Sequence, residues 1–182
     1  MYKTPGRPLL LAETAAFAGL IVLGSWISIP FVPVPFTLQT LFVLLSGTVM
    51  RRYAVLPTGL YVLMGILGIP VFHSGSAGLG ILLEPTGGYI LGFIPGAFVT
   101  GIFFEHRERT ARVLGIVLGD GVIFLCGMSW LSLSTGISLF NAFLIGVLPF
   151  IPGDVVKGYA VWLIGERLER VSDTGQDGGS GA

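Results

Sequence analysis

Six long apolar runs make up most of this chain, and the basic residues fall in every second link between them. Only 11% of the 182 residues are charged and 53% are hydrophobic, whereas soluble domains are about one quarter charged. So little charge cannot cover a water-exposed surface of this size, but it suits a surface that faces lipid. We therefore expect an all-α integral membrane protein with one membrane domain.

The apolar runs give six predicted spans: residues 9–29, 35–50, 54–69, 86–104, 113–133 and 139–165. The second is short, about 24 Å of helix, so it would cross only where flanking residues snorkel or the bilayer thins. The basic residues outside these spans are Lys3, Arg7, Arg51, Arg52, Arg107, Arg109, Arg112, Arg167 and Arg170. They occur at the N-terminus and after the second, fourth and sixth spans, which is the positive-inside pattern. Both termini are therefore predicted to be cytoplasmic. The links 30–35, 70–85 and 134–138 are predicted to face outward, the second of them as an apolar lid.

Domain organisation is simple. A single six-helix membrane domain is expected over residues 1–171. Residues 172–182 are rich in Gly, Ser and Asp, and we expect this tail to be disordered.

The stretch Val147–Lys157 carries the least expected charges of the chain. Pro149 and Pro152 disfavour a regular helix around them, and Pro152 is predicted to start a separate half-helix with Asp154 in its first turn, where the helix dipole favours an anion. Asp154 and Lys157 are three residues apart and would share a helix face. A charge near the centre of a span costs about 2.5–3.5 kcal/mol. Two interpretations stay open: an internal ion pair that fixes the last span, or a binding site.

A second cluster, Glu84–Tyr89, begins the fourth predicted span. Thr86 is a plausible N-cap. Gly87 and Gly88 could leave backbone N–H groups open to a ligand, or could let two helices pack closely, which the residues alone favour. Tyr89 has the character of an interfacial aromatic residue.

The run Pro33–Gln39 begins the second predicted span at the same face. Its Gln39 could bond a ligand or a neighbouring helix. The starts of the second and fourth spans and the break in the sixth all lie at or below the outer surface in the predicted topology. Together they would outline one pocket that opens outward.

Three motifs in order, Pro33–Gln39, Pro85–Phe93 and Val147–Lys157, resemble the BioY family. Its members are the biotin-specific substrate-binding (S) components of energy-coupling-factor (ECF) vitamin transporters. The resemblance implies a six-helix S-component in the cytoplasmic membrane of a prokaryote, which captures biotin at the outer face and needs no cofactor of its own. It also implies a transmembrane coupling subunit and two ATPase subunits as partners. Because the chain has no Gly-x-x-x-x-Gly-Lys-Ser/Thr motif, ATP hydrolysis must come from those partners.

The resemblance also assigns candidate site residues. The substrate-binding candidates are Phe36, Thr37, Gln39, Thr86, Gly87, Gly88, Tyr89, Asp154 and Lys157. Asp154 could accept from the ureido N–H groups of biotin, and Lys157 could meet the ureido oxygen or the carboxylate. The end of biotin that faces each motif stays open. For docking, S-components commonly use an Ala-x-x-x-Ala pattern in the first helix, which Ala12 and Ala16 match.

Several other classes of function are disfavoured. The single cysteine, Cys126, excludes disulfide frameworks and Cys-rich metal sites within the chain, and His73 and His106 fall in links on opposite sides, so no metal site is expected. No basic patch indicates nucleic acid. A membrane-embedded enzyme would need an activated nucleophile, and a channel would need polar rings along a pore. A channel or structural subunit, and an S-component for another vitamin, stay as alternatives.

Overall fold

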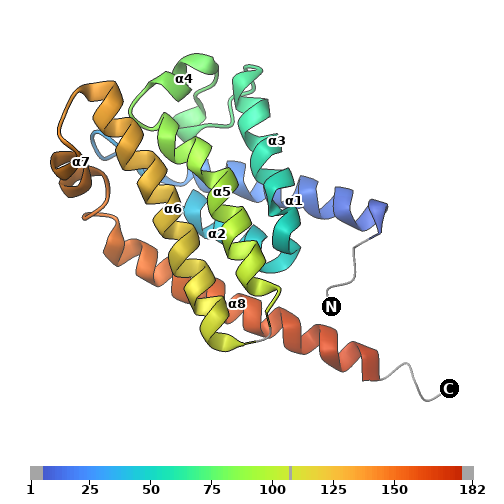
Figure 1. Ribbon diagram of the computed structural model, residues 1–182. Coiled ribbons are helices and arrows are strands. Elements are labelled where there is room, and N and C mark those ends of the chain that lie inside the picture. The colour runs from blue at the N-terminus through green and yellow to red at the C-terminus, as the bar shows by residue number, and fades with distance from the viewer. Residues whose placement is uncertain (1–5, 107, 178–182) are drawn as a thin grey trace.

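The computed structural model describes residues 6–106 and 108–177 of the protein, and most of them are helical (Figure 1). The elements in chain order are α1 Arg7–Trp26, β1 Ser28–Ile29, β2 Phe36–Thr37, α2 Gln39–Met50, η1 Arg51–Ala54, α3 Val55–Ile66, η2 His73–Gly75, α4 Leu79–Leu83, α5 Gly87–Phe104, α6 Arg109–Thr135, α7 Leu139–Gly146 and α8 Ile151–Asp177. The two short strands pair antiparallel, Ser28 with Thr37 and Ile29 with Phe36.

Helix α5 lies against α6 along its length (Figure 1) because glycines recur every fourth residue on the face between them. A Cβ atom at Gly92 would lie 2.9 Å from the Cβ of Cys126 on α6. One at Gly96 would lie 2.5 Å from Cγ1 of Ile123. Small residues that allow such close approach are a common basis of helix packing in membranes.

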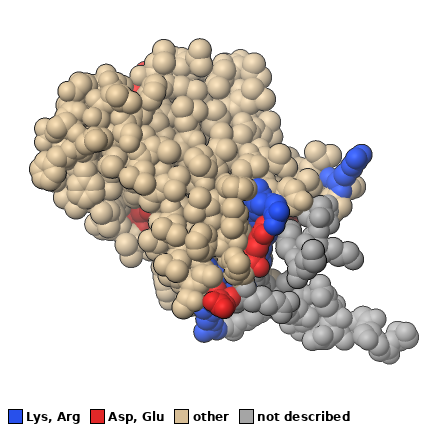
Figure 2. All heavy atoms as spheres, viewed as in Figure 1, with Lys and Arg blue, Asp and Glu red and all other residues tan. Residues whose placement is uncertain are grey.

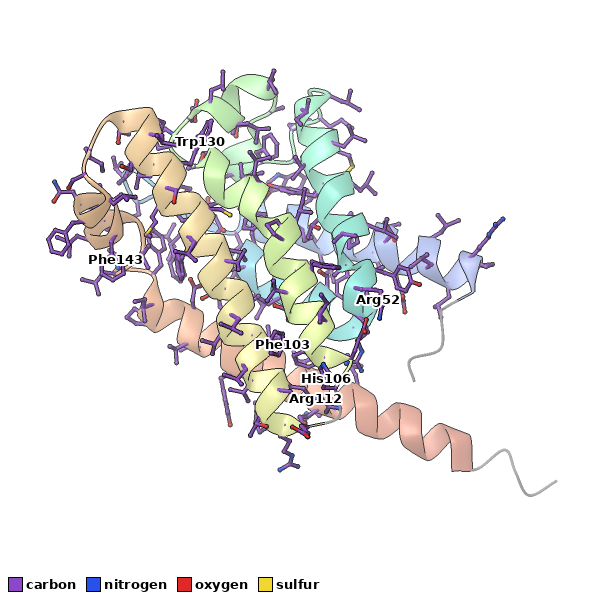
Figure 3. The ribbon with its side chains drawn as sticks, in the orientation of Figure 1. Arg52, Phe103, His106, Arg112, Trp130 and Phe143 are labelled. Atoms are coloured by element: carbon purple, nitrogen blue, oxygen red, sulfur yellow. The ribbon has the colours of Figure 1, made fainter. Side chains whose placement is uncertain are left out.

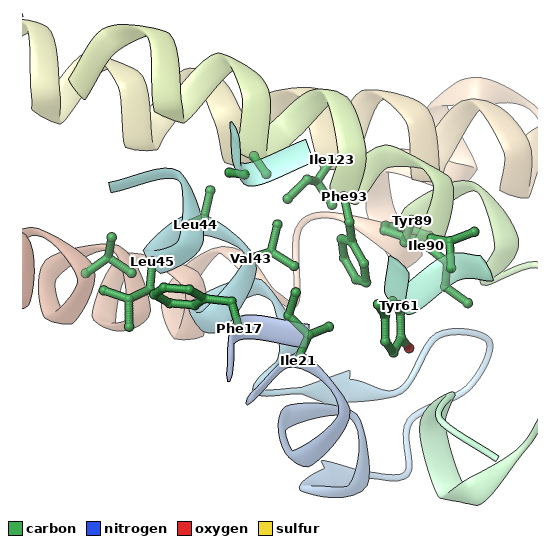
Figure 4. Close-up of a cluster of buried hydrophobic side chains, with 14 of the residues drawn as sticks. Phe17, Ile21, Val43, Leu44, Leu45, Tyr61, Tyr89, Ile90, Phe93 and Ile123 are labelled. Atoms are coloured by element: carbon green, nitrogen blue, oxygen red, sulfur yellow. The ribbon is translucent and has the colours of Figure 1, made fainter. Parts of the chain in front are cut away.

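The protein is apolar both inside and outside. Figure 4 shows the buried cluster, to which α1, α2, α3, α5 and α6 contribute Phe17, Ile21, Val43, Leu44, Leu45, Tyr61, Tyr89, Ile90, Phe93 and Ile123. The outward face of α6 is also apolar, with Val117 60% and Leu125 57% exposed. Continuous exposed apolar surface of this kind requires lipid or protein against it.

Helices α1, α5 and α6 are each long and apolar enough to cross a membrane, and α7 with α8 forms a fourth candidate, bent by 61° at its break. Helices α2 and α3 have 12 residues each, about 18 Å of helix, against a hydrocarbon core of about 30 Å. The described structure therefore supports a multi-pass helical membrane protein with three or four clear candidate spans. Part of the second predicted span is not helical because Phe36–Thr37 pairs with β1 instead.

The two ends of the molecule differ in charge. On the face drawn in Figure 2, charged atoms gather toward the lower end and the N-terminus, while the upper part is nearly free of them. Figure 3 places His106 and Arg112 toward the lower end and Trp130 toward the other. Arg52 donates two hydrogen bonds to Glu105, at 2.7 and 2.6 Å, and these bonds hold the pKa of that carboxyl below its usual value. Arg112 pairs with Glu166 of α8 at 3.2 Å.

At the C-terminus, α8 continues to Asp177, whereas the sequence predicts disorder from residue 172 onward. Helix growth adds one backbone hydrogen bond for each residue fixed, so a helix can carry on past its last apolar turn. Residues 178–182 of the predicted tail lie outside the described part.

The predicted lid, residues 70–85, contains η2 and α4 and is tied to the helices at both of its ends. The indole N–H of Trp26 donates to the carbonyl of Pro70 at 3.3 Å, and that of Trp130 donates to the carbonyl of Glu84 at 3.0 Å. Between these ties, Phe72 is fully buried.

Candidate functional site

The last predicted span is broken in the way that its prolines indicate. Helix α7 ends at Gly146, residues 147–150 form a turn, and α8 starts at Ile151. Pro152 is the second residue of α8, where a missing N–H costs nothing because the first N–H groups of a helix have no partner inside it. Asp154 lies in the first turn, where the helix dipole favours its negative charge. The prediction of a separate half-helix is confirmed.

Asp154 and Lys157 form a buried ion pair. The ammonium of Lys157 lies 2.6 Å from Oδ1 of Asp154, and their side chains are only 7% and 5% exposed. Thr40 of α2 closes a triangle with them: its hydroxyl accepts from Lys157 at 2.9 Å and donates to Asp154 at 3.2 Å. The cluster therefore joins α2 to α8 and holds one donor and one acceptor group at fixed positions.

Aromatic rings cover one side of this cluster. The ammonium of Lys157 lies 4.1 Å from the ring centroid of Phe36, within the range of a cation–π contact. Phe36 stacks on Phe150, with centroids 6.0 Å apart. Gly153 makes room for this arrangement, because a Cβ atom there would overlap the ring of Phe36. Phe36 therefore lies beside the ion pair and positions it.

The ion pair forms part of the lining of a pocket. Its lining residues are Val34, Pro35, Thr37, Gln39, Thr40, His73, Thr86, Tyr89, Ile90, Phe93, Ile123, Phe124, Phe150, Asp154 and Lys157. Six of the predicted substrate-binding residues are among them: Thr37, Gln39, Thr86, Tyr89, Asp154 and Lys157. The first residues of α2, α5 and α8 thus meet at one place, together with the loop that carries His73.

Gln39 is engaged by its neighbours as well as lining the pocket. Its amide nitrogen donates to the hydroxyl of Tyr61 on α3 at 2.5 Å, and its amide oxygen accepts from Thr37 at 3.2 Å. Tyr89 likewise uses its hydroxyl to donate to the carbonyl of Gly146 at 2.8 Å, which ties α5 to the end of α7. Tyr89 is buried, so it is not an interfacial belt residue, and it presents its ring to the pocket.

Thr86 is a buried polar residue of the pocket whose side chain lacks a partner in the described structure. It is 7% exposed, and its hydroxyl has no hydrogen-bond partner among the described residues. Although Thr86 is the N-cap of α5, its side chain makes no capping bond. A buried hydroxyl without a partner costs about 1–3 kcal/mol, so this group fits a position that a ligand would satisfy.

Gly87 and Gly88 do not line the pocket. A Cβ atom at Gly87 would collide with the carbonyl of Leu82, and one at Gly88 would collide with Trp130 and the carbonyl of Cys126. These contacts fit the interpretation that the two glycines serve close packing.

Two polar pocket residues were not found by sequence reasoning, Thr40 and His73. Thr40 directly follows the Pro33–Gln39 motif, but a lone threonine in an apolar run is unremarkable until its partners are known. His73 is one of only two histidines, which is a signal that could have drawn attention to its loop. In the described part of the chain, no three His, Cys, Asp or Glu residues gather in a way that could hold a metal ion.

On α1, Ala12 and Ala16 lie on an exposed face together with Ala15 and Gly19. A groove beside this face, between α1 and α3, is lined by small and apolar residues that include Ala15 and Ala16. The face is thus free for close approach by another helix.

The sequence is similar to a single family over almost its whole length. The BioY family model matches residues 5–174. The chain is 42% identical over 163 residues to the biotin transporter BioY of Thermotoga maritima, which covers 88% of this chain and 96% of that protein. It is 40% identical over 156 residues to the probable biotin transporter BioY of Pyrococcus horikoshii, which covers 85% and 93%. Among solved structures, the S-component for biotin from an ECF-type ABC transporter matches with a TM-score of 0.81 and 25% identity, over 93% of this chain and 95% of that one.

Proposed function

The chain belongs to the BioY family, and on this premise we propose that it captures biotin for uptake as the substrate-binding subunit of an ECF-type transporter. Relatives that match most of its length are named biotin transporters, and the matching structure is a biotin S-component. Because its family is one of transporters, the chain is a transporter subunit and not an enzyme.

The observation that carries the proposal is the buried cluster of Asp154, Lys157 and Thr40 in the pocket lining. Biotin has a ureido group with two N–H donors and one oxygen acceptor, beside an apolar thioether ring. The carboxylate of Asp154 can accept from a ureido N–H, and the ammonium of Lys157 can donate to the ureido oxygen. Hydrogen bonds to such charged groups are about twice as strong as neutral ones. Apolar lining residues such as Phe93 and Ile123 suit the thioether ring.

The remaining substrate contacts follow from the same pocket. Thr86 offers the unpartnered hydroxyl, while Thr37, Gln39 and Tyr89 shape the walls. We include Phe36 as the ring that supports Lys157. Gly87 and Gly88 act through close packing in this proposal, and their backbone contributes to the site only by fixing the start of α5.

We further propose that the protein crosses the cytoplasmic membrane six times, with both termini inside and the pocket open to the outside. The charge asymmetry between the two ends of the molecule supports this orientation (Figure 3). A transmembrane coupling subunit and two ATPase subunits would complete the transporter. The coupling subunit would dock on the exposed small-residue face of α1 at Ala12 and Ala16, where a helix can approach closely.

Calorimetry with biotin on the purified, detergent-solubilised protein tests the proposal. The informative variant is Asp154→Asn with Lys157→Gln, because either single change leaves a buried unpaired charge that can cost about 3–5 kcal/mol of stability. If the pair contacts biotin, the double variant regains its melting temperature while affinity falls about tenfold to a hundredfold per lost charge-assisted bond. Near-native affinity in the folded double variant would remove both residues from the site.

A further inference from the structure

The ion pair in the pocket lining suits one end of biotin better than the other. Asp154 and Lys157 already neutralise each other at 2.6 Å. A ligand carboxylate placed there would lie beside the carboxylate of Asp154, and like charges repel strongly where water is excluded. A ureido group, which has donors and an acceptor but no charge, fits both partners. The carboxylate of biotin therefore needs a different part of the pocket.

Of the described residues that line this pocket, His73 is the only basic side chain besides Lys157. It belongs to η2, in the loop between α3 and α5, whereas Lys157 belongs to α8. The two basic groups of the pocket thus come from separate elements, and only Lys157 is joined to a carboxylate partner within hydrogen-bond distance.

The loop holds His73 at the pocket through its neighbours. Phe72 is fully buried and lies edge-on to Tyr61, with centroids 5.5 Å apart. On the other side, Ser76 donates both its hydroxyl and its backbone N–H to the carbonyl of His73, at 2.8 and 3.1 Å. Ser74 takes the left-handed conformation, with φ 56°, which tightens the turn between them.

Resting on the proposed function, we propose that His73 is a further substrate-binding residue: in its protonated form it pairs with the carboxylate of biotin, which directs the ureido ring to Asp154 and Lys157. The chain would then bind biotin more tightly in mildly acidic surroundings than at neutral pH. The charge of the imidazole is the part of the site that changes with pH, since the ion pair of Asp154 and Lys157 is neutral overall.

The direction of the pH effect follows from the surroundings of His73. Burial lowers the pKa of its imidazole, and the nearby carboxylate of Glu84 offsets part of that change. The other ionisable groups that share the pocket are Tyr89, Asp154 and Lys157. In the free protein His73 is therefore mostly neutral at pH 7. A bound carboxylate favours the protonated form of the His73 imidazole, so the affinity for biotin rises as the pH falls. The rise ends at a pH of about 4.5, where the carboxylate of biotin itself becomes protonated.

The experiment measures biotin affinity by calorimetry between pH 5.5 and pH 8, on the full chain in detergent. We expect about tenfold tighter binding at the acidic end, the effect of one charge-assisted hydrogen bond. Biotinamide, in which the carboxylate is replaced by a neutral amide, should show no such dependence. His73→Gln should bind biotin at every pH with the weaker affinity that the native protein shows at pH 8. His73→Arg, which is charged over the whole range, should bind at every pH with the tighter affinity that the native protein shows at pH 5.5.

The second histidine provides the matched control. His106 is exposed at the opposite end of the molecule (Figure 3), so His106→Gln should keep the native pH profile. If biotin binds but His73→Gln keeps that profile, or if biotinamide shows it as well, the assignment of His73 is overturned. If biotin fails to bind at any pH, the proposed function fails instead, so the two failures are distinguishable.

Discussion

The two buried threonines Thr86 and Thr100 differ in how their hydroxyl groups are used: one is available to a ligand, and the other bonds within the fold. Thr86 has no hydrogen-bond partner among the described residues, whereas Thr100 donates to the carbonyl of Gly115 on α6 at 3.1 Å. Valine has nearly the same shape as threonine without the hydroxyl. We expect Thr86→Val to weaken biotin binding about fivefold to tenfold, the value of one neutral hydrogen bond, with no loss of melting temperature.

Thr100→Val is the control for that prediction. It should lower stability by about 0.5–1.5 kcal/mol, because it removes one buried hydrogen bond between α5 and α6, and biotin affinity should stay native. Calorimetry and thermal melting on both variants decide between the roles. Native affinity in Thr86→Val would show that its hydroxyl makes no contact with biotin.

At the scale of single residues, the charged pair could be predicted from the residues alone, whereas the partners of the neutral polar residues could not. Asp154 and Lys157 stand out because a buried charge is costly in an apolar run, and the structure does pair them. Thr40 is part of the same cluster, but a threonine can satisfy its hydroxyl within its own helix, so the sequence gives no reason to expect a partner on α8. The partners of Gln39 and Tyr89 depend equally on which helices become neighbours.

The pocket walls depend on the packing of α5 against α6. The glycines between these two helices allow that packing to be tested. Gly96→Ala would bring a Cβ atom within 2.5 Å of Ile123 and 2.8 Å of the carbonyl of Gly119. Overpacking of this kind costs about 1–3 kcal/mol, so we expect a lower melting temperature in detergent. Gly121→Ala on α6 is the control, because nothing lies within 4 Å of a Cβ there. It should melt at the native temperature or above, since alanine favours helix, and equal melting of the two variants would contradict the packing role.

Element boundaries were predictable where they depend on local chemistry. Prolines and charged links mark the ends of α5 and α6 and the break before α8, all within a few residues of the structure. The start of α2 at Gln39 rather than at Pro35 was not predictable, because hydropathy reports how long an apolar run is and not whether its backbone is helical. The pairing of Phe36–Thr37 with Ser28–Ile29 takes residues out of that helix, and it depends on two segments meeting in space.

For the whole molecule, the proposed orientation in the membrane can be measured directly. Ser76 lies in the loop that carries His73, and Arg109 lies at the start of α6, in the charged hairpin. In a Cys126→Ser background, a cysteine at Ser76 should react with a membrane-impermeant thiol reagent added to intact cells. A cysteine at Arg109 should react only after the cells are opened. The reverse pattern would overturn the topology, and with it the outward-facing pocket.

Capture and coupling should be separable functions, because the pocket and the small-residue face of α1 involve different residues. Ala16 lies on that exposed face, and close helix approach in membranes depends on such small side chains. We expect Ala16→Trp to bind biotin within about twofold of the native affinity. Recovery of the coupling subunit in a pull-down, and biotin uptake in cells, should both fall sharply. Val117→Trp, which adds similar bulk to an exposed site on α6, should leave binding, recovery and uptake intact.

If Ala16→Trp still assembles and transports like the native chain, the partner docks elsewhere. If both tryptophan variants lose assembly together, bulk anywhere on the lipid-facing surface is enough to block it, and α1 has no special part in coupling.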